Sequence, residues 1–183
     1  MAHRVASIFR GGLFAGKTAL VTGGATGIGY AIASELLQLG CSVVISSRKA
    51  QNLENAVQEL RQVAAKSSEG APEVSHVVCN IRSEDEVEGM MEEVVNRLGP
   101  LNFLCNNGGG QFPSAARKIK AKGWKAVIDT NLNGTFNCCS AAYRFVCSCS
   151  SRFRHDDRCR QPSQMHFCVD IPVTAWNNMV EAS

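Results

Sequence analysis

Long hydrophobic runs are absent from this sequence of 183 residues. The longest ones, such as residues 18–21 and 43–45, fall far short of the roughly 20 apolar residues that a membrane-spanning helix needs, so we expect no membrane span. The sequence also lacks a large excess of either sign of charge, because it has 19 Lys and Arg and 16 Asp and Glu, and its net charge is only +3. We expect no segment to gather the basic residues, and this argues against a nucleic-acid partner.

Acidic residues are missing before Glu35, and no apolar signal peptide opens the chain. Residues 1–16 are therefore interpreted as a basic N-terminal extension, either a frayed terminus or, less simply, a mitochondrial presequence. Without a secretion signal, the nine cysteines do not predict a disulfide framework. Cys41, Cys79 and Cys105 fall inside apolar strand-like runs, so we expect reduced and buried thiols.

Apolar residues recur with two alternating periods from residue 17 onward. Strand-like runs cover residues 17–21, 41–46, 74–79 and 101–105, and helical spacing covers residues 28–39, 53–65, 83–99 and 124–147. Ser83 and Glu86 have the spacing of a capping box at the start of the third helical segment. Strands that alternate with helices in this way predict βαβ units, which wind right-handed into a parallel sheet covered on both faces. The predicted fold class is α/β, a Rossmann-like doubly wound parallel sheet.

Regular periodicity fades near the end of the chain. From Arg144 onward lysine disappears while Arg, Cys and Ser crowd together, and we expect no folded element there. The domain is thus predicted to cover residues 17–147, truncated after its fifth helix, with a poorly ordered tail at residues 148–183. The strand at residues 101–105 would then lie at an uncovered sheet edge, which favours aggregation. No metal site is predicted, because zinc ligands need paired, matched spacings that are not found among Cys147, Cys149, His155, Cys159, His166 and Cys168.

A glycine-rich turn joins the first strand to the first helix. Thr22–Gly29 reads TGGATGIG and places Gly23, Gly27 and Gly29 where a diphosphate must approach main-chain N–H groups. Side chains at these positions would block the approach, and the helix N-terminus adds roughly half a positive charge. A glycine triplet alone is a weak signal, but its position between a strand and a helix predicts a dinucleotide site.

The end of the second strand indicates which dinucleotide would bind. A site that prefers NAD places Asp or Glu here to accept from the ribose 2′-hydroxyl, whereas this chain has two serines followed by Arg48 and Lys49. These cations favour a 2′-phosphate, so the predicted cofactor is NADP(H). An ordinary solvated pair at a helix start is the alternative. Asn80 and Ile81, after the third strand, would lie beside the adenine.

A competing motif lies just upstream. Gly11–Thr18 reads GGLFAGKT and matches the phosphate-loop pattern of NTPases, Gly-x-x-x-x-Gly-Lys-Thr. That loop requires a helix directly after the Lys-Thr pair, but residues 19–22 favour a strand and stop at two glycines. No apolar strand ending in Asp follows to hold Mg²⁺. The NTPase interpretation is retained only as a minor alternative.

At TGGATGIG, and again at Asn106-Asn107-Gly108-Gly109, the sequence resembles the short-chain dehydrogenase/reductase family, whose fourth strand ends in Asn-Asn-Ala-Gly. The similarity spans most of residues 14–143. Together with the residues considered above, it implies an NADPH site formed by Gly23, Thr26, Gly27, Ile28, Gly29, Arg48, Lys49, Asn80, Ile81, Asn106, Asn107 and Gly108. It also implies that Asn131 is the helix asparagine of the catalytic group.

The stretches NNGGGQF (residues 106–112) and KGWKAVIDTNLNGTF (residues 122–136) look most like members of the family that reduce enoyl-CoA thioesters in peroxisomes. This resemblance implies an NADPH-dependent oxidoreductase that converts trans-2-enoyl-CoA to saturated acyl-CoA in fatty acid metabolism. The 2,4-dienoyl-CoA reductases are similar and stay an alternative, as do other oxidoreductases of the family. A peroxisomal location is implied as well, but the final Glu181-Ala182-Ser183 is not a peroxisomal tripeptide. The cytoplasm and mitochondria therefore stay open.

The family completes its active site with a Ser and with a Tyr and a Lys spaced Tyr-x-x-x-Lys. In this chain Tyr30 is followed four residues on by Ser34, and Tyr143 by Cys147, and no other tyrosine occurs. We therefore expect the chain to be inactive alone, and its tail resembles translation outside the family's reading frame or an alternative exon. A non-catalytic NADP-binding or subunit-binding form is the second hypothesis. In the family, the helix that contains Asn131 commonly packs against a partner subunit in a homo-oligomer.

Overall fold

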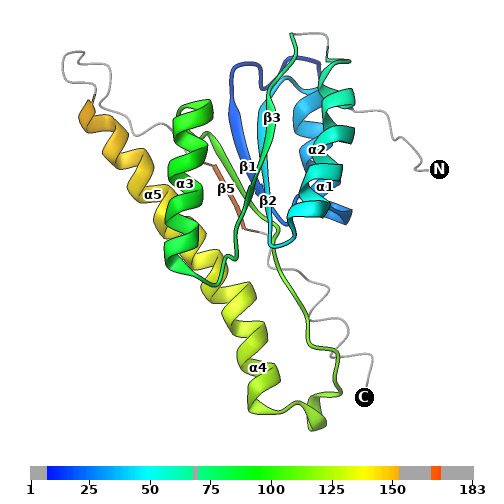
Figure 1. Cartoon of the computed structure of the whole chain (residues 1–183), viewed down its shortest axis with the longest axis vertical. Helices are drawn as coiled ribbons and strands as arrows, with labels where there is room; N and C mark the ends of the chain where they lie inside the picture. The colour runs from blue at the N-terminus through cyan, green and yellow to red at the C-terminus, as the bar shows by residue number, and fades with distance from the viewer. Residues whose placement is uncertain (1–7, 68–69, 153–165, 170–183) are drawn as a thin grey trace.

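The computed structural model describes residues 8–67, 70–152 and 166–169, in which strands and helices alternate along the chain (Figure 1). The strands are β1 Thr18–Thr22, β2 Ser42–Ser47, β3 Val74–Val78, β4 Phe103–Asn106 and β5 His166–Val169. The helices are α1 Gly27–Gln38, α2 Ala50–Ala64, α3 Glu84–Leu98, the 3₁₀ helix η1 Ala116–Lys118, α4 Ala121–Ile128, the π-helix η2 Asp129–Asn133 and α5 Gly134–Arg152. The strands form one parallel sheet in the order β3-β2-β1-β4-β5. The predicted Rossmann-like fold class is confirmed.

The sheet separates two apolar cores, because successive side chains of a strand point to opposite faces. Ala19, Val21 and Val43 face a core shared with α1 and α2, whereas Leu20 and Val44 face the core shared with α3 and α5. Figure 1 shows the two helix pairs on opposite sides of the strands. All five residues of β1 are buried, as expected for a strand that is covered on both faces. This central strand fixes the position of the loop that follows it.

The start of α3 confirms part of the predicted cap. The Ser83 hydroxyl accepts a hydrogen bond from the main-chain N–H of Glu86, which satisfies one of the free donors of the first turn. The Glu86 carboxylate accepts from the main-chain N–H of Asn80 at 2.8 Å, rather than from Ser83. The cap therefore also fixes the corner between β3 and α3.

The prediction of a single helix over residues 124–147 is wrong in detail. The structure has α4, the π-helical turn η2 and α5 in its place, preceded by the short helix η1. Side chains compete with the helical main chain at this point. Thr130 Oγ1 donates to the carbonyl of Ala126 at 2.8 Å, and Asn131 Nδ2 donates to that of Val127 at 2.9 Å. Such bonds loosen the regular helical ladder, and π-helical turns are frequent at functional sites.

The C-terminal part of the chain also corrects the sequence interpretation. The expectation of no folded element after Arg144 is wrong, because α5 continues to Arg152 and β5 pairs in parallel with β4. β4 is therefore not an uncovered edge, and the sheet continues beyond the fifth helix. β5 is only four residues long, and the largely polar stretch before it, residues 153–165, shows no strand or helix period in the sequence. The rest of the tail, residues 153–165 and 170–183, lies outside the described residues.

The structure contradicts the NTPase alternative. Residues 11–16 form turns in which Gly12 and Gly16 both have a φ of 72°. Thr18 then begins β1, so a strand follows the Lys-Thr pair. A phosphate loop needs the N-terminus of a helix at that position. The motif is instead the entry into the sheet, where the Lys17 carbonyl accepts from the N–H of Ser42 at 2.8 Å.

The described residues contain neither a membrane-spanning helix nor a cluster of metal-binding side chains. No described helix is both long enough and apolar enough to cross a membrane. Among the described residues, no three His, Cys, Asp or Glu side chains come together in a way that could hold a metal ion. The side chains of the tail residues considered for zinc lie outside that description.

The pairing of β5 with β4 gives a testable prediction about solubility. A variant that ends at Arg152 loses β5 and leaves the hydrogen-bonding groups of β4 unpaired, so it should aggregate. A control variant that ends at Val169 keeps β5 and should stay as soluble as the full chain. Size-exclusion chromatography with light scattering compares the three proteins. Equal behaviour of the two shortened variants would contradict the role given to β5.

Candidate functional site

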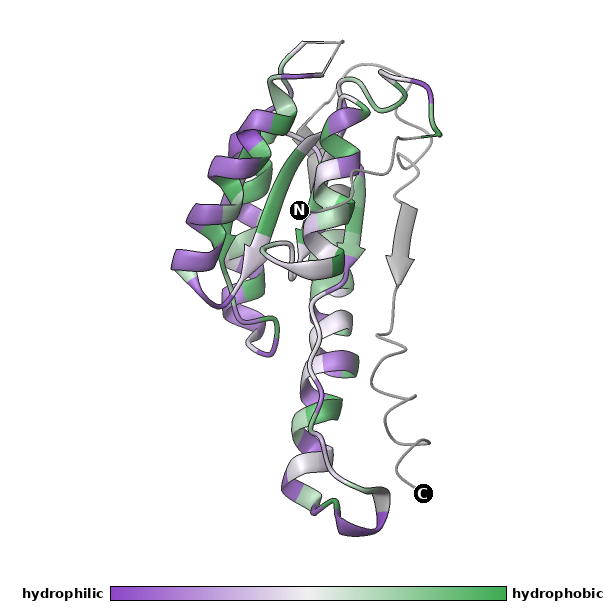
Figure 2. Ribbon diagram, turned by 90° about the vertical axis from the view of Figure 1, so that its right-hand side faces the viewer, coloured by the Kyte–Doolittle hydropathy of each residue, from purple (hydrophilic) through white to green (hydrophobic). Residues whose placement is uncertain are grey.

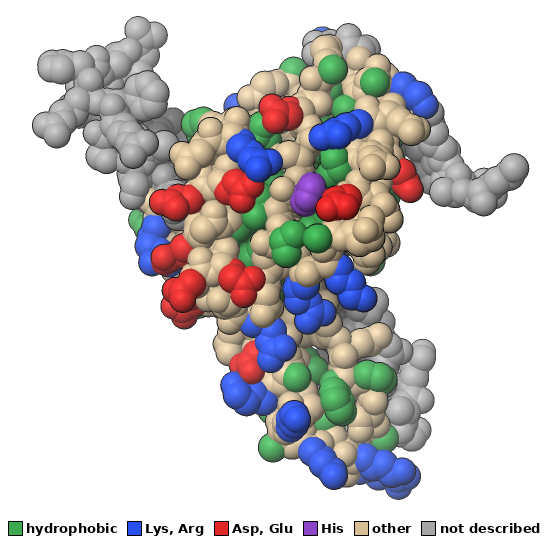
Figure 3. Space-filling view, viewed as in Figure 1, with side chains coloured by type: hydrophobic (Ala, Val, Ile, Leu, Met, Phe, Trp, Pro, Cys, Tyr) green, Lys and Arg blue, Asp and Glu red, His purple; other side chains and the backbone are tan. Residues whose placement is uncertain are grey.

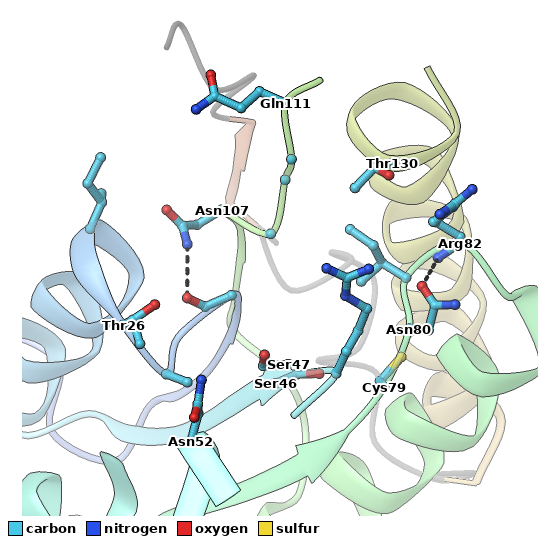
Figure 4. A pocket seen from close by; sticks show the side chains of 18 residues that line it. Thr26, Ser46, Ser47, Asn52, Cys79, Asn80, Arg82, Asn107, Gln111 and Thr130 are labelled. Carbon is cyan, nitrogen blue, oxygen red and sulfur yellow. Dashed lines mark hydrogen bonds between the residues drawn. The ribbon is translucent and has the colours of Figure 1, made fainter. Parts of the chain in front are cut away.

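A pocket with a volume of about 410 Å³ lies at the carboxyl ends of β1, β2, β3 and β4, and Figure 4 shows the side chains around it. Its lining residues lie at the ends of the strands or just after them: Gly23, Ala25, Thr26 and Ile28 after β1; Ser46 and Ser47 at the end of β2, with Arg48 and Asn52 after it; Cys79, Asn80, Ile81 and Arg82 after β3; Asn107, Gly108, Gly109, Gly110 and Gln111 after β4; and Thr130 of η2. Doubly wound sheets bind their ligands in crevices at this edge. The pocket is therefore the candidate site.

The corner after β1 is held against the loop that follows β4. The side-chain amide of Asn107 donates to the main-chain carbonyls of Thr22 at 3.0 Å and Gly23 at 3.3 Å (Figure 4 draws the second bond). The Thr22 hydroxyl accepts from the N–H of Gly108 at 2.8 Å. A Cβ at Gly108 would lie only 3.0 Å from that hydroxyl oxygen. The two loops therefore form one continuous wall of the pocket.

The three motif glycines serve different purposes. Gly23 has a φ of 67°, a conformation that other residues rarely adopt, and a Cβ there would lie 2.9 Å from Asn107 Nδ2. A Cβ at Gly29 would overlap the same amide and the carbonyl oxygen of Gly23. At Gly27, by contrast, no heavy atom lies within 4 Å of the missing side chain. Gly23 and Gly29 are thus required by packing inside the protein, and only Gly27 leaves the open space expected of all three.

The first turn of α1 offers free hydrogen-bond donors. Its N-cap is Thr26, whose side chain makes no capping bond, and no acidic residue stands in the first turn. The main-chain N–H groups at the start of α1 therefore keep the partial positive charge of a helix N-terminus. Thr26 and Ile28 line the pocket, so this charge is available to an anion there.

Basic and neutral residues form the side of the pocket at the end of β2. Arg48 and Asn52 line it, and the residues that line it include no Asp or Glu. Ser46 is buried, and its hydroxyl has no hydrogen-bond partner within the described residues, a state that a ligand can relieve. Lys49, predicted to act beside Arg48, is the N-cap of α2 and does not line the pocket. The sequence-predicted pair thus contributes one cation to the pocket wall.

The corner between β3 and α3 contributes a second cation, which the sequence analysis missed. Arg82 lines the pocket together with the predicted Asn80 and Ile81. Its guanidinium lies 3.7 Å from the carboxylate of Asp129 in η2. The Lys125 ammonium, which donates to that carboxylate at 2.9 Å, holds the pKa of Asp129 below its ordinary value. Asp129 therefore stays ionised at neutral pH and keeps Arg82 beside the pocket.

Asn131, the predicted catalytic asparagine, does not line the pocket. It is buried in η2, where its amide nitrogen donates to the carbonyl of Gly110 at 2.7 Å and its amide oxygen accepts from the Gly110 N–H at 3.1 Å. Asn106 is also buried, and its amide donates to Cys139 Sγ of α5 at 3.3 Å, away from the pocket. Asn131 therefore affects the site through the backbone at Gly110, whereas Asn106 links β4 to α5.

The structure brings most of the predicted cofactor residues to one pocket, namely Gly23, Thr26, Ile28, Arg48, Asn80, Ile81, Asn107 and Gly108. The predicted residues outside its lining are Gly27, Gly29, Lys49 and Asn106. The sequence analysis named no site role for Ser46, Asn52, Cys79, Arg82, Gln111 and Thr130, which also line it. All but Thr130 lie within a few residues of a strand's carboxyl end, a signal that could have found them.

The thiols around the site are poorly ionised. Burial raises the pKa of Cys79, which lines the pocket, to about 11, and burial raises the pKa of Cys41 and Cys138 to about 12. A thiol that stays protonated is a poor nucleophile. Cys41 and Cys79 are buried as predicted, whereas Cys105 is only partly buried. The chemistry of the pocket therefore comes from its hydrogen-bond donors and cations.

This donor set fits a dinucleotide. The start of α1 and the guanidinium groups of Arg48 and Arg82 suit phosphate, while the side chains of Ser47, Asn52 and Asn80 can bond to ribose hydroxyls or to a base. The absence of a carboxylate from the lining residues removes the repulsion that a phosphate would otherwise meet.

Comparison with known proteins assigns the family. The short chain dehydrogenase family profile matches residues 17–151. A probable 2,4-dienoyl-CoA reductase of Bacillus subtilis (strain 168), described as (2E)-enoyl-CoA-producing, is 37% identical over 128 residues, which are 70% of this chain and 48% of that protein. A peroxisomal 2,4-dienoyl-CoA reductase of Arabidopsis thaliana, described as (3E)-enoyl-CoA-producing, is 32% identical over 142 residues, 76% of this chain and 45% of that protein.

Solved structures agree with this assignment. The citronellol catabolism dehydrogenase of Pseudomonas aeruginosa PAO1 has a TM-score of 0.68 at 37% identity, over 76% of this chain and 54% of that one. An actinorhodin polyketide ketoreductase solved with NADPH has a TM-score of 0.64 at 32% identity, over 70% of this chain and 46% of that one. The chain belongs to the short-chain dehydrogenase family of oxidoreductases, which bind a nicotinamide cofactor. It spans about half the length of the curated relatives it matches.

The contact between Gly29 and Asn107 can be tested with a matched pair of substitutions. Gly29→Ala adds a methyl group that overlaps packed atoms, so it should lower the free energy of unfolding by about 2 kcal/mol. Gly89→Ala, on the exposed side of α3 with no atom within 4 Å, is the control. It should raise the free energy of unfolding by about 0.5 to 1 kcal/mol, because alanine favours helix. Urea titrations measure both, and a neutral Gly29→Ala would refute the close contact.

Proposed function

We propose that this chain supplies the cofactor-binding half of a reductase that uses NADPH to convert trans-2-enoyl-CoA to saturated acyl-CoA. The observation that carries the cofactor choice is the end of β2, where Arg48 lines the pocket and no lining residue is a carboxylate. A site for NAD would place Asp or Glu near the ribose 2′-hydroxyl. Two relatives named for 2,4-dienoyl-CoA reduction support an acyl-CoA thioester as the substrate class.

Different residues of the pocket would bind different parts of this cofactor. The start of α1 would bind the diphosphate through its main-chain N–H groups. Arg48 would pair with the 2′-phosphate, and Asn80 and Ile81 would border the adenine. Asn131 would keep the loop at Gly110 in place through its two hydrogen bonds. When bound, NADPH supplies the hydride that adds to the β-carbon of the enoyl thioester.

Turnover needs groups that this sequence does not contain. In the family the Tyr and Lys exchange the proton and hold the ribose, and neither Tyr30 nor Tyr143 opens Tyr-x-x-x-Lys. Reduction of an enoyl thioester also requires a donor that stabilises the thioester oxygen and a proton for the α-carbon. The amide nitrogen of Asn131 is already committed to the carbonyls of Gly110 and Val127. We therefore propose that the chain binds NADPH without reducing enoyl-CoA by itself.

Two further assignments belong to the same proposal. The names of the relatives favour 2,4-dienoyl-CoA as the alternative substrate, which shares the thioester and the cofactor. The peroxisome is the proposed location, since one relative is named as peroxisomal, with the cytoplasm or mitochondria as alternatives.

A subunit contact is proposed along the helix that contains Asn131. Leu132, Phe136 and Tyr143 are large apolar residues of η2 and α5 that are all more than half exposed. Their spacing places them on roughly one side of the helical segment. We propose that this side packs against a second copy of the chain in a homo-oligomer, which is also the form that a non-catalytic, subunit-binding role would need.

Nucleotide discrimination tests the role of Arg48. Arg48→Asp removes the partner of the 2′-phosphate and adds an acceptor for the ribose hydroxyl. The affinity for NADPH should fall about tenfold or more, while that for NADH should rise. Arg61→Asp, the same change of charge in the last turn of α2, should leave the preference unchanged. Fluorescence titration with both nucleotides gives the Kd values, and unchanged discrimination in Arg48→Asp would refute the assignment.

Catalysis is tested directly with the purified full chain. NADPH mixed with crotonyl-CoA and the chain should keep its near-ultraviolet absorbance, because the proton donor and the ribose clamp are both missing. A parallel sample without crotonyl-CoA controls for slow decomposition of the nucleotide. A steady decrease that scales with protein concentration and needs crotonyl-CoA would show that the chain is active alone.

A further inference from the structure

Basic residues gather on the segment that follows the pocket's glycine loop. The members of this surface, named here the basic lobe, are Arg117, Lys118, Lys120, Lys122 and Lys125, all of them exposed. The expectation that no segment gathers Lys and Arg is therefore wrong for residues 117–125, which also contain no acid. Figure 3 shows Lys and Arg side chains around the lower end of the molecule, with hydrophobic side chains between them.

Most of the charge on the basic lobe has no counter-charge within the part of the chain that the structure describes. Lys125 pairs with Asp129 at 2.9 Å. Within the described residues, Lys118, Lys120 and Lys122 form no salt bridge. Neighbouring cations without counter-charges repel one another and raise the local concentration of anions. A ligand with several negative charges would therefore be stabilised on this surface.

Aromatic side chains stand among these cations. Phe112 and Trp124 are each 50% exposed. A Cβ at Gly123 would lie 2.8 Å from Phe112 Cδ1, so the Phe112 ring packs directly on the main chain of α4. Exposed rings beside cations are suited to contact a nucleobase, which has a flat face and accompanies phosphate in a nucleotide.

The basic lobe adjoins the cofactor pocket. Gln111 lines the pocket and immediately precedes Phe112. Thr130, which follows α4, lines the pocket as well, and Asn131 beside it is bonded to Gly110. Figure 2 shows the strand arrowheads pointing toward the end of the molecule at which the α4 region lies. A ligand on the basic lobe can therefore extend into the rim of the pocket.

We propose that the basic lobe binds the phosphate-bearing nucleotide end of the CoA thioester, through Lys118, Lys120 and Lys122. The inference rests on the proposed function for its substrate class. A CoA thioester carries a diphosphate and a 3′-phosphate at one end and the reacting acyl group at the other. Phosphates on the lobe would leave the acyl end to reach the rim at Gly110 and Gln111. Anionic lipid and nucleic acid share the attraction to cations, but neither accounts for a rim shared with a nucleotide pocket.

The test is a titration of the full chain, saturated with NADPH, with CoA. The triple variant Lys118→Ala, Lys120→Ala, Lys122→Ala is compared with a control that loses as many exposed cations elsewhere, Lys17→Ala, Arg61→Ala, Lys66→Ala. CoA affinity should fall about tenfold in the lobe variant, because three cations that pair with its phosphates are lost, and should not change in the control. Calorimetry gives the Kd, and equal melting temperatures show that both variants are folded.

Titrations with dephospho-CoA and with NADPH test whether the basic lobe binds the CoA phosphates separately from the cofactor. Dephospho-CoA, which lacks the 3′-phosphate, should bind the unaltered chain several-fold more weakly than CoA. NADPH affinity should be the same in the lobe variant as in the unaltered chain, because the lobe lies outside the cofactor pocket. A lobe variant that loses NADPH affinity as strongly as CoA affinity would contradict a separate CoA surface.

Other outcomes would overturn the inference. Equal CoA affinity in the two triple variants would do so. So would binding to phosphatidylserine vesicles or to a single-stranded oligonucleotide that depends on the same lysines and that CoA fails to displace. If NADPH shows no saturable binding to the unaltered chain, the proposed function fails instead. In that case the CoA titration without NADPH still decides whether the lobe binds CoA.

Discussion

The contact between the corner after β1 and the loop after β4 is the constraint on which the site depends. Asn107 crosses between them and donates to the carbonyls of Thr22 and Gly23, and it can approach only because Gly23 and Gly29 lack side chains. The contact fixes where α1 begins, and therefore where its free N–H groups lie. Phosphate binding is in this sense a consequence of internal packing, since glycines that the protein needs for its own fold also leave a helix N-terminus open.

Local signals were sufficient for the elements that hold one side of the site. β1 is an apolar run in the sequence because it is buried on both faces. The spacing of Ser83 and Glu86 marks the start of α3. Arg48 could be placed because it directly follows the second strand, whereas Asn107 was placed through the resemblance to the family. Arg82 also follows a strand closely, but the position of its side chain beside the pocket depends on how η2 packs against the β3–α3 corner.

Other features failed to show in the sequence for physical reasons. The π-helical turn arises from side-chain bonds, such as that from Thr130 to Ala126, which no apolar period reveals. β5 lies in a part of the sequence without strand or helix period, and only its pairing with β4 identifies it. The cations of residues 117–125 are visible in the sequence, but apolar and small residues separate them, so they do not form an uninterrupted basic run. Only the placement of η1 and α4 shows that all of them face outward.

The extra residue in the π-helical turn sets the rotation of everything that follows it. If residues 129–133 were wound as a regular α-helix without the π-helical turn, α5 would be rotated by roughly 100° about its axis relative to α4. Cys138, Ala141 and Ala142, whose small side chains let α5 lie close to the sheet, would swing away, and bulkier neighbours would be forced into their place. The wide winding of this turn therefore decides which side of α5 belongs to the core and which side another molecule can meet.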